Sequence, residues 1–217
     1  AKPPEAFIAN AKICQPFAAL TTGPNVKSAY LRQLPFGASV MITGPEEKGY
    51  LPVMGLDDDG MILNGFIPKA QIQPDSEPCN EDWTDWAEKF IGAPYKWGGR
   101  SAAGLDCSAL VQLSLAASRH SLPRDTGPQL QLLKKQTYVS DTLHAPFDDL
   151  TAGDFGRGDL IYWKEHVAIC VDANAIIHAN SFHNCVAIEP REAAFTRIAA
   201  NFGPPIAHIH KAAFRQI

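Results

Sequence analysis

The stretch FIGAPYKWGGRSAAGLDCSALVQ (residues 90–112) carries the strongest structural signal in this chain. A Gly-rich turn leads into a run of small and apolar side chains, which predicts a helix that begins near Cys107. Asp106 has a side chain suited to cap that helix. A thiol attacks a carbonyl only as thiolate, and the start of a helix lowers the pKa of a cysteine placed there. Cys107 is therefore the candidate nucleophile, with a buried structural cysteine as the alternative.

Two histidines on neighbouring predicted strands complete a possible catalytic set. His166 opens HVAICV (166–171), and His178 lies inside AIIHAN (175–180). Adjacent antiparallel strands can bring these side chains together. His166 would then act as the base, and His178 would hold its distal nitrogen. Two structural histidines, or a metal site, are the alternatives.

No metal is expected, because no carboxylate or further histidine stands at a convincing spacing from this pair. The other histidines fall in predicted loops, turns or ends, where we expect surface positions: His120, His144, His183, His208 and His210.

The rest of the chain reads as an α+β fold preceded by a small β-barrel. Residues 14–73 alternate short apolar segments with Gly, Pro and Asp, which is typical of short strands and turns. Residues 74–80 form a plausible linker, and a helix capped by Asn80 would follow. From residue 158 onward the pattern changes to strands, so helices are expected to precede an antiparallel sheet.

Composition bounds the possible functions. The 217 residues suit two unequal domains, and 46% hydrophobic residues can bury a core. A net charge of −4 without a basic stripe argues against nucleic acid as a partner. The five cysteines include no CxxC pair, which suggests a reduced protein without metal. We expect no cofactor and no obligate protein partner.

The chain's location is expected to be cytoplasmic. Its start, AKPPEAFIAN, lacks the basic and apolar regions of a secretion signal, and no apolar run is long enough to span a bilayer. Removal of a signal before Ala1 would instead make the protein periplasmic or exported.

Four ordered motifs resemble the NlpC-type cell-wall cysteine peptidases. Residues 90–112 are similar to the family's "PYxWGG" and "DCSGLVQ", with Ala109 in place of the usual Gly. LPRDTGPQL (122–130) resembles "PRxSxxQ", GDLIYWKEHVAICV (158–171) resembles "GDLxFxxxHVxIY", and IIHAN (176–180) resembles "xIHAS".

The resemblance implies a papain-like domain over residues 80–217 that hydrolyses murein stem peptides. It assigns Cys107 as nucleophile, His166 as general base and His178 as the polar third member. Tyr95 matches a tyrosine beside the nucleophile, whose hydroxyl could join the backbone N–H of Cys107 in holding the oxyanion. Packing against Trp97 is the alternative for Tyr95.

The first domain, residues 1–74, resembles the bacterial SH3-like modules of murein-recycling enzymes. SAYLRQLPFGASVMI (28–42) carries this likeness, whereas LNGFI (63–67) has Leu63 where those modules have Tyr. In such relatives the barrel closes one end of the cleft, so that only short peptides with a free N-terminal L-Ala are cut.

We assign four residues to substrate binding: Asp106, Ser108, Asp125 and Thr126. The resemblance places a carboxylate at Asp125 against the L-Ala amine, with Thr126 beside it. The alternative is that Asp125 pairs with Arg124 or caps a helix.

The expected function is a γ-D-glutamyl-L-diamino acid endopeptidase. It would act on murein tri- or tetrapeptides by thiolate attack and an acyl-enzyme. An L-Ala–D-Glu endopeptidase, a cell-wall amidase, or an inactive wall-binding module are the alternatives. The presence of Cys107, His166 and His178 together argues against the last of these.

Overall fold

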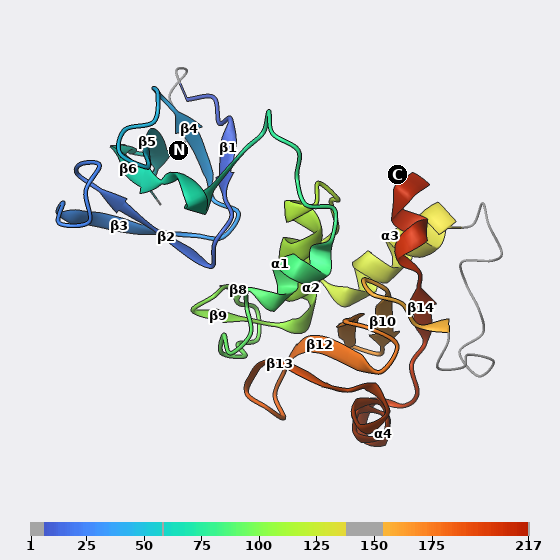
Figure 1. Ribbon diagram of the computed structural model, residues 1–217. Helices are drawn as coiled ribbons and strands as arrows, with labels where there is room; N and C mark the ends of the chain where they lie inside the picture. The colour runs from blue at the N-terminus through green and yellow to red at the C-terminus, as the bar shows by residue number, and fades with distance from the viewer. Residues whose placement is uncertain (1–6, 58, 138–153, 217) are drawn as a thin grey trace. The chain divides into compact units, whose positions relative to one another are not determined.

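The structure, a computed structural model, describes residues 7–57, 59–137 and 154–216 (Figure 1). His144 lies outside these residues. The chain divides into two units, Ala1–Cys79 and Asn80–Ile217, and the predicted linker spans the division. Over the described residues, no helix has the length and apolar character needed to cross a membrane.

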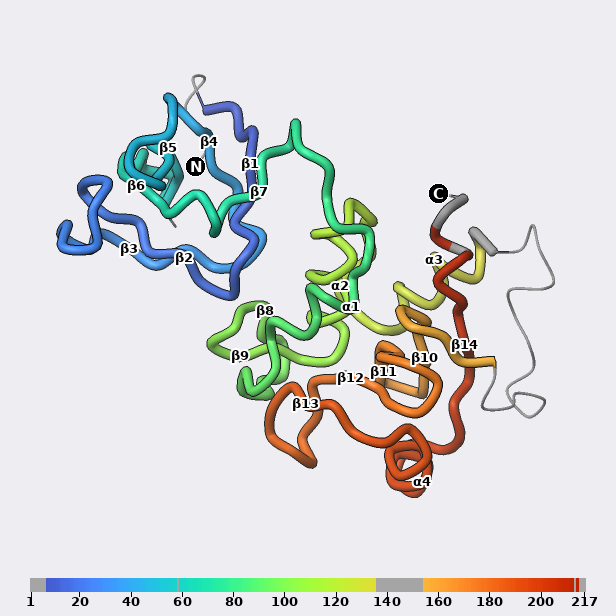
Figure 2. The backbone as a smooth tube through the Cα atoms, viewed as in Figure 1, coloured from blue at the N-terminus to red at the C-terminus, as the bar shows by residue number. Residues whose placement is uncertain are grey.

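The first unit is built from one antiparallel sheet. Its seven strands lie in the order β3-β2-β6-β5-β4-β1-β7 (Figure 2). Residues 14–73, where the sequence predicted short strands, contain β2 to β6. The strand bounds are β1 Ala11–Ile13, β2 Phe17–Thr21, β3 Tyr30–Pro35, β4 Ser39–Ile42, β5 Tyr50–Leu56, β6 Ile62–Pro68 and β7 Ile72–Pro74.

Buried and more exposed residues alternate along the strands, and the buried ones form the core of this unit. In β5 every second residue is buried, the period-2 pattern of a sheet with one covered face. Leu20, Val40 and Ile67 are fully buried in the resulting apolar cluster. Gly65 lets β6 approach β2, because a Cβ there would lie 2.6 Å from the carbonyl oxygen of Thr21.

The second unit centres on a five-stranded antiparallel sheet in the order β13-β12-β11-β10-β14. The strands predicted from residue 158 onward are present as β10 to β13. A two-stranded ribbon, β8 and β9, precedes the helix of Cys107. The bounds are β8 Arg100–Ser101, β9 Gly104–Leu105, β10 Leu160–Trp163, β11 His166–Cys170, β12 Ala175–Asn180, β13 Cys185–Pro190 and β14 Ala207–Ile209.

Helices cover both faces of this sheet. One face packs Trp163, Ala168 and Ile176 against Ala194 and Ile198 of α4. On the opposite side α2 packs against β11 and β12, and α1 packs against α2 (Figure 1). The bounds are α1 Trp83–Glu88, α2 Cys107–Ala117, α3 Thr126–Thr137 and α4 Arg191–Phe202, with a final 3₁₀ helix over Lys211–Gln216.

Buried polar bonds fix these helices to the sheet. The indole N–H of Trp83 in α1 donates to the carbonyl of Gly158 at 2.7 Å. The amide of Gln129 in α3 donates to the carbonyl of Ser108 at 3.0 Å, and its oxygen accepts from the Tyr162 hydroxyl at 3.3 Å. Gln129 thus links α3 to α2 and to β10 beside the predicted nucleophile.

Three local predictions were wrong. Asp82, not Asn80, caps α1, because its carboxylate accepts from the backbone N–H of Thr84. His208 is fully buried on β14, where it bonds Asp159, rather than lying at the surface. The predicted order of helices before sheet is also incomplete, since α4 stands between β13 and β14.

Candidate active site

Asp106 organises the start of α2. Its carboxylate accepts from the backbone N–H of Ala109, as predicted for a helix cap, and from that of Gly98, both at 2.9 Å. Arg124 donates to both of its oxygens. Burial by itself would raise the pKa of Asp106, but the bonds from Arg124 and these N–H groups hold it below its usual value. Asp106 is therefore a fixed anion beside Cys107.

Cys107 is the first residue of α2 and is 7% exposed. Burial raises the pKa of its thiol to about 11, against the lowering that the helix start predicted. The backbone N–H groups of Val167 and Ser108 oppose this shift, and the charge of Asp106 adds to it. The contact with Val167 brings the thiol to the residue that follows His166 on β11.

Tyr95 lies close enough to the thiol to sense its charge. Its backbone pairs with Leu105, two residues before Cys107. Burial raises the pKa of the Tyr95 hydroxyl, and the nearby Cys107 and Asp106 raise it further. Trp97, the alternative packing partner, is 81% exposed, so little of its ring is available to cover Tyr95. Tyr95 is thus beside Cys107, the candidate nucleophile.

His166 and His178 form a direct hydrogen bond, as the strand pattern predicted. Nε2 of His166 lies 2.8 Å from Nδ1 of His178. Burial lowers the pKa of His166 to about 3, and the neighbouring His178 and Arg197 act in the same direction. Burial also lowers the pKa of His178, although Glu189 opposes this. Both imidazoles are therefore neutral at neutral pH.

Glu189 and Arg197 extend this pair, and the sequence reasoning missed both. Oε1 of Glu189 lies 2.6 Å from Nε2 of His178. Arg197, on α4, donates a short hydrogen bond to the same oxygen. An acid within the otherwise apolar predicted strand CVAIEP (185–190) was the signal in the sequence for Glu189. The sequence analysis did not predict α4, so it could not predict that Arg197 lies near Glu189.

The proposed binding residues fall into two groups. Ser108 is buried, and its hydroxyl contacts Asp106 and Arg124 at 3.2 and 2.9 Å. Asp125 lies just before α3 with a 77% exposed side chain, and its carboxylate is 3.9 Å from Arg124. Thr126 is half-buried at the first position of α3. Arg124 therefore connects the Asp125 segment to both neighbours of Cys107.

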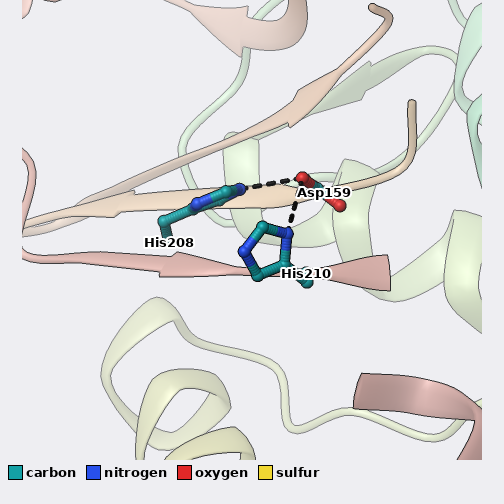
Figure 3. A group of neighbouring side chains, drawn as sticks. All are labelled: Asp159, His208 and His210. Carbon is teal, nitrogen blue, oxygen red and sulfur yellow. Dashed lines mark hydrogen bonds and ion pairs between the residues drawn. The ribbon is translucent and has the colours of Figure 1, made fainter. Parts of the chain in front are cut away.

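Two clusters of side chains in the second unit have donor atoms close enough to surround a metal ion. One is His178, His183 and Glu189, and the other is Asp159, His208 and His210. In the second, Oδ2 of Asp159 lies 2.8 Å from Nε2 of His208 and 3.3 Å from Nδ1 of His210 (Figure 3).

Hydrogen bonding accounts for the second cluster. Both oxygens of Asp159 already accept from backbone N–H groups, those of Gly156 and Lys211. Nδ1 of His208 is buried with no partner among the described residues. A metal on Nε2 of His208 would force a proton onto that Nδ1 and leave it unpaired, whereas metal-binding histidines normally pair this group. Asp159 and His208 are thus best understood as a structural pair that joins β10 to β14.

The arrangement around Cys107 suits acyl transfer. It combines a thiol at a helix start, a neutral imidazole on the adjacent strand, and a hydroxyl near the thiol. A neutral imidazole can accept the thiol proton during attack on a carbonyl.

Comparison with known proteins identifies a family. Residues 92–200 match the NlpC/P60 family. The chain is 32% identical over 143 residues to the gamma-D-glutamyl-L-lysine dipeptidyl-peptidase of Bacillus subtilis, an alignment that covers 62% of this chain and 42% of that protein. It is 26% identical over 157 residues to dipeptidyl-peptidase 6 of Lysinibacillus sphaericus, covering 72% and 49%. The chain thus matches less than half the length of either relative.

A solved structure is similar over both units. The NlpC/P60 family protein from Bacillus cereus ATCC 10987 aligns with a TM-score of 0.68 and 19% identity. The alignment covers 93% of this chain and 63% of that one. At this identity the likeness concerns the fold alone.

Proposed function

Because the chain belongs to the NlpC/P60 family, we propose that it is a cysteine peptidase that hydrolyses peptide bonds in bacterial cell-wall peptides. The observation that carries the proposal is the contact between the start of α2 and β11. The thiol of Cys107 contacts the backbone N–H of Val167, next to His166, and His166 bonds His178. A nucleophile, a base and an orienting group are the three parts that such a peptidase needs.

The reaction follows from these three groups. His166 takes the proton of Cys107 as sulfur adds to the carbonyl carbon, and the carbonyl oxygen becomes an anion. The backbone N–H of Cys107 and the Tyr95 hydroxyl are the donors proposed to stabilise it. His166 then gives the proton to the leaving amine, the C–N bond breaks, and a thioester remains. Water, deprotonated by His166, hydrolyses the thioester and restores the thiol.

For the bond cut, we propose the γ-D-glutamyl-L-diamino acid bond in short stem peptides with a free N-terminal L-Ala. The names of the Bacillus and Lysinibacillus relatives, which describe dipeptidyl-peptidases, support this choice. A free amine needs a paired anion when it enters a partly closed site. Asp125 provides an exposed carboxylate on the segment joined to Asp106 and Ser108 through Arg124.

We also propose that the second unit has a papain-like fold and the first an SH3-like barrel. Helices packed on an antiparallel sheet, with the nucleophile at a helix start, support the former. Short antiparallel strands around a single apolar core support the latter.

The test is incubation with the defined tripeptide L-Ala-γ-D-Glu-L-diamino acid, followed by mass spectrometry. Release of the free diamino acid together with L-Ala-D-Glu supports the proposal. Release of L-Ala alone would identify an L-Ala–D-Glu endopeptidase instead. The Cys107→Ser variant is the control, and product formation by this variant would remove Cys107 from the reaction.

A further inference from the structure

We propose that Glu189 is a positioning residue that sets the proton arrangement of His166 through His178, and that Arg197 keeps Glu189 ionised. The inference rests on the proposed function, because it concerns the same base. It goes beyond that function by adding a fourth and a fifth group from β13 and α4.

A histidine in the orienting position is ambiguous by itself. A neutral imidazole has one N–H and one bare nitrogen, and either can face its neighbour. If Nδ1 of His178 carried the proton, it would donate to Nε2 of His166. His166 would then hold its own proton on Nδ1 and could not accept another there. The orienter therefore needs a partner that fixes its tautomer.

Glu189 provides that partner. An ionised carboxylate only accepts hydrogen bonds, so the 2.6 Å contact requires a proton on Nε2 of His178. Nδ1 of His178 is then bare, and the 2.8 Å contact requires a proton on Nε2 of His166. Nδ1 of His166 is left bare, which makes it the atom that receives the thiol proton.

Burial of His178 favours this one arrangement of protons over the others. His178 is 0% exposed, so water cannot replace either of its partners. Each reversed proton would leave two facing N–H groups or two facing lone pairs beside the buried His178 ring, and an unpaired buried polar group is unfavourable.

Arg197 explains how Glu189 stays ionised. Burial would raise the pKa of Glu189, but the bonds from His178 and Arg197 lower it to about 2. A protonated Glu189 could donate to Nε2 of His178. The proton positions on both His178 and His166 would then be reversed. Within residues 7–57, 59–137 and 154–216, the charged or titratable groups that face Glu189 are His178, Arg197 and, at 3.9 Å, His183.

The experiment compares Glu189→Ala with the conservative Glu189→Gln. The amide oxygen of Gln can still accept from His178 and Arg197, whereas Ala offers no acceptor. Glu192→Gln is the matched control, since Glu192 is an exposed acid at the start of α4. Nitrogen-15 NMR of the histidine rings reads the tautomers directly and needs no substrate.

We expect His166 to carry its proton on Nε2 in the unmodified protein, in Glu189→Gln and in Glu192→Gln. Glu189→Ala gives a mixture of tautomers, and its kcat falls about 10- to 100-fold while KM stays near its original value. Glu189→Gln recovers most of that loss, and circular dichroism checks that each variant is folded. Because Glu189→Ala leaves Arg197 without its acceptor, the double variant Glu189→Ala/Arg197→Ala repeats the measurement with both charges removed.

An unchanged His166 tautomer in the folded Ala variants would overturn the inference, as would an unchanged kcat. The NMR result decides the inference even if no cell-wall peptide is cleaved, in which case only the proposed function fails.

Discussion

Arg124 donates hydrogen bonds to both carboxylate oxygens of Asp106, at 2.9 and 2.7 Å. The pair distinguishes the two acids that were assigned to substrate binding, Asp106 and Asp125. Asp106 is committed to Arg124 and to the cap of α2, whereas Asp125 is largely exposed. Asp125 is therefore the carboxylate with the greater freedom to meet a ligand.

The first prediction concerns this amine. N-acetylation of the tripeptide removes the positive charge, and we expect kcat/KM to fall by about 10²-fold, or about 3 kcal/mol, the size of a lost charge-assisted hydrogen bond. Asp125→Asn weakens turnover of the free-amine peptide and narrows its advantage over the acetylated one. Steady-state kinetics with both peptides measure this. Glu81→Gln, a change of an exposed acid elsewhere, is the control. Equal rates on the two peptides would contradict the assignment of Asp125.

The second prediction concerns the orienting group. His178→Gln keeps an acceptor for the N–H of His166, whereas His178→Ala does not. We expect His178→Ala to lower kcat about 10- to 100-fold and His178→Gln to lower it less. Equal losses in folded proteins, checked by circular dichroism, would show that His178 does not act through its hydrogen bond.

The third prediction concerns the thiol. Because burial raises the pKa of Cys107 to about 11, alkylation of Cys107 by iodoacetamide is expected to be slow at pH 7. The rate then rises continuously up to pH 10. Peptide mapping by mass spectrometry follows this residue separately from the other cysteines, and urea-unfolded protein provides the reference rate. A rate that levels off below pH 7 would mean that the thiolate forms before substrate arrives.

The fourth prediction concerns acid stability. The pKa of His166 falls from 6.5 to about 3 on folding, so between these values the unfolded chain binds a proton that the folded protein does not. The free energy of unfolding therefore decreases as pH falls through this window, by up to about 1.4 kcal/mol per pH unit for one such group. Urea denaturation at pH 7.5, 5.5 and 4.5 measures the slope. We expect a smaller slope for His166→Gln, and an unchanged slope would contradict the lowered pKa of His166.

The fifth prediction concerns the turn before Cys107. A Cβ on Gly99 would lie 2.3 Å from the carbonyl oxygen of Gly104, so Gly99→Ala must displace the backbone of the β8–β9 ribbon. We expect a loss of about 1–3 kcal/mol in the free energy of unfolding. Gly127→Ala is the matched control, because a Cβ there meets no atom within 4 Å and favours α3 by about 0.5–1 kcal/mol. Similar effects of both changes in thermal unfolding would disprove the close approach.

The sequence anticipated the parts of the site that depend on local pattern. Alternation placed His166 and His178 on adjacent strands, and the polar residue before an apolar run identified Asp106 as a cap. Their contacts in the structure confirm both predictions. The catalytic and binding roles of these residues stay predictions.

The parts that were missed depend on contacts between distant segments. Glu189 stands opposite Ile176 in the strand register, so it reaches His178 diagonally rather than directly. Arg197 lies on α4, which begins after Pro190 and buries few apolar side chains, so its helical pattern was weak. The raised pKa of Cys107 follows from burial, which helix position alone does not reveal.

The burial of Cys107 also bears on oxidation. Peroxides react with thiolates that they can reach, and sulfenic acid forms slowly on a thiol that stays protonated and covered. At 7% exposure Cys107 meets both conditions. The Cys107 thiol is therefore expected to survive long exposure to air without added reductant.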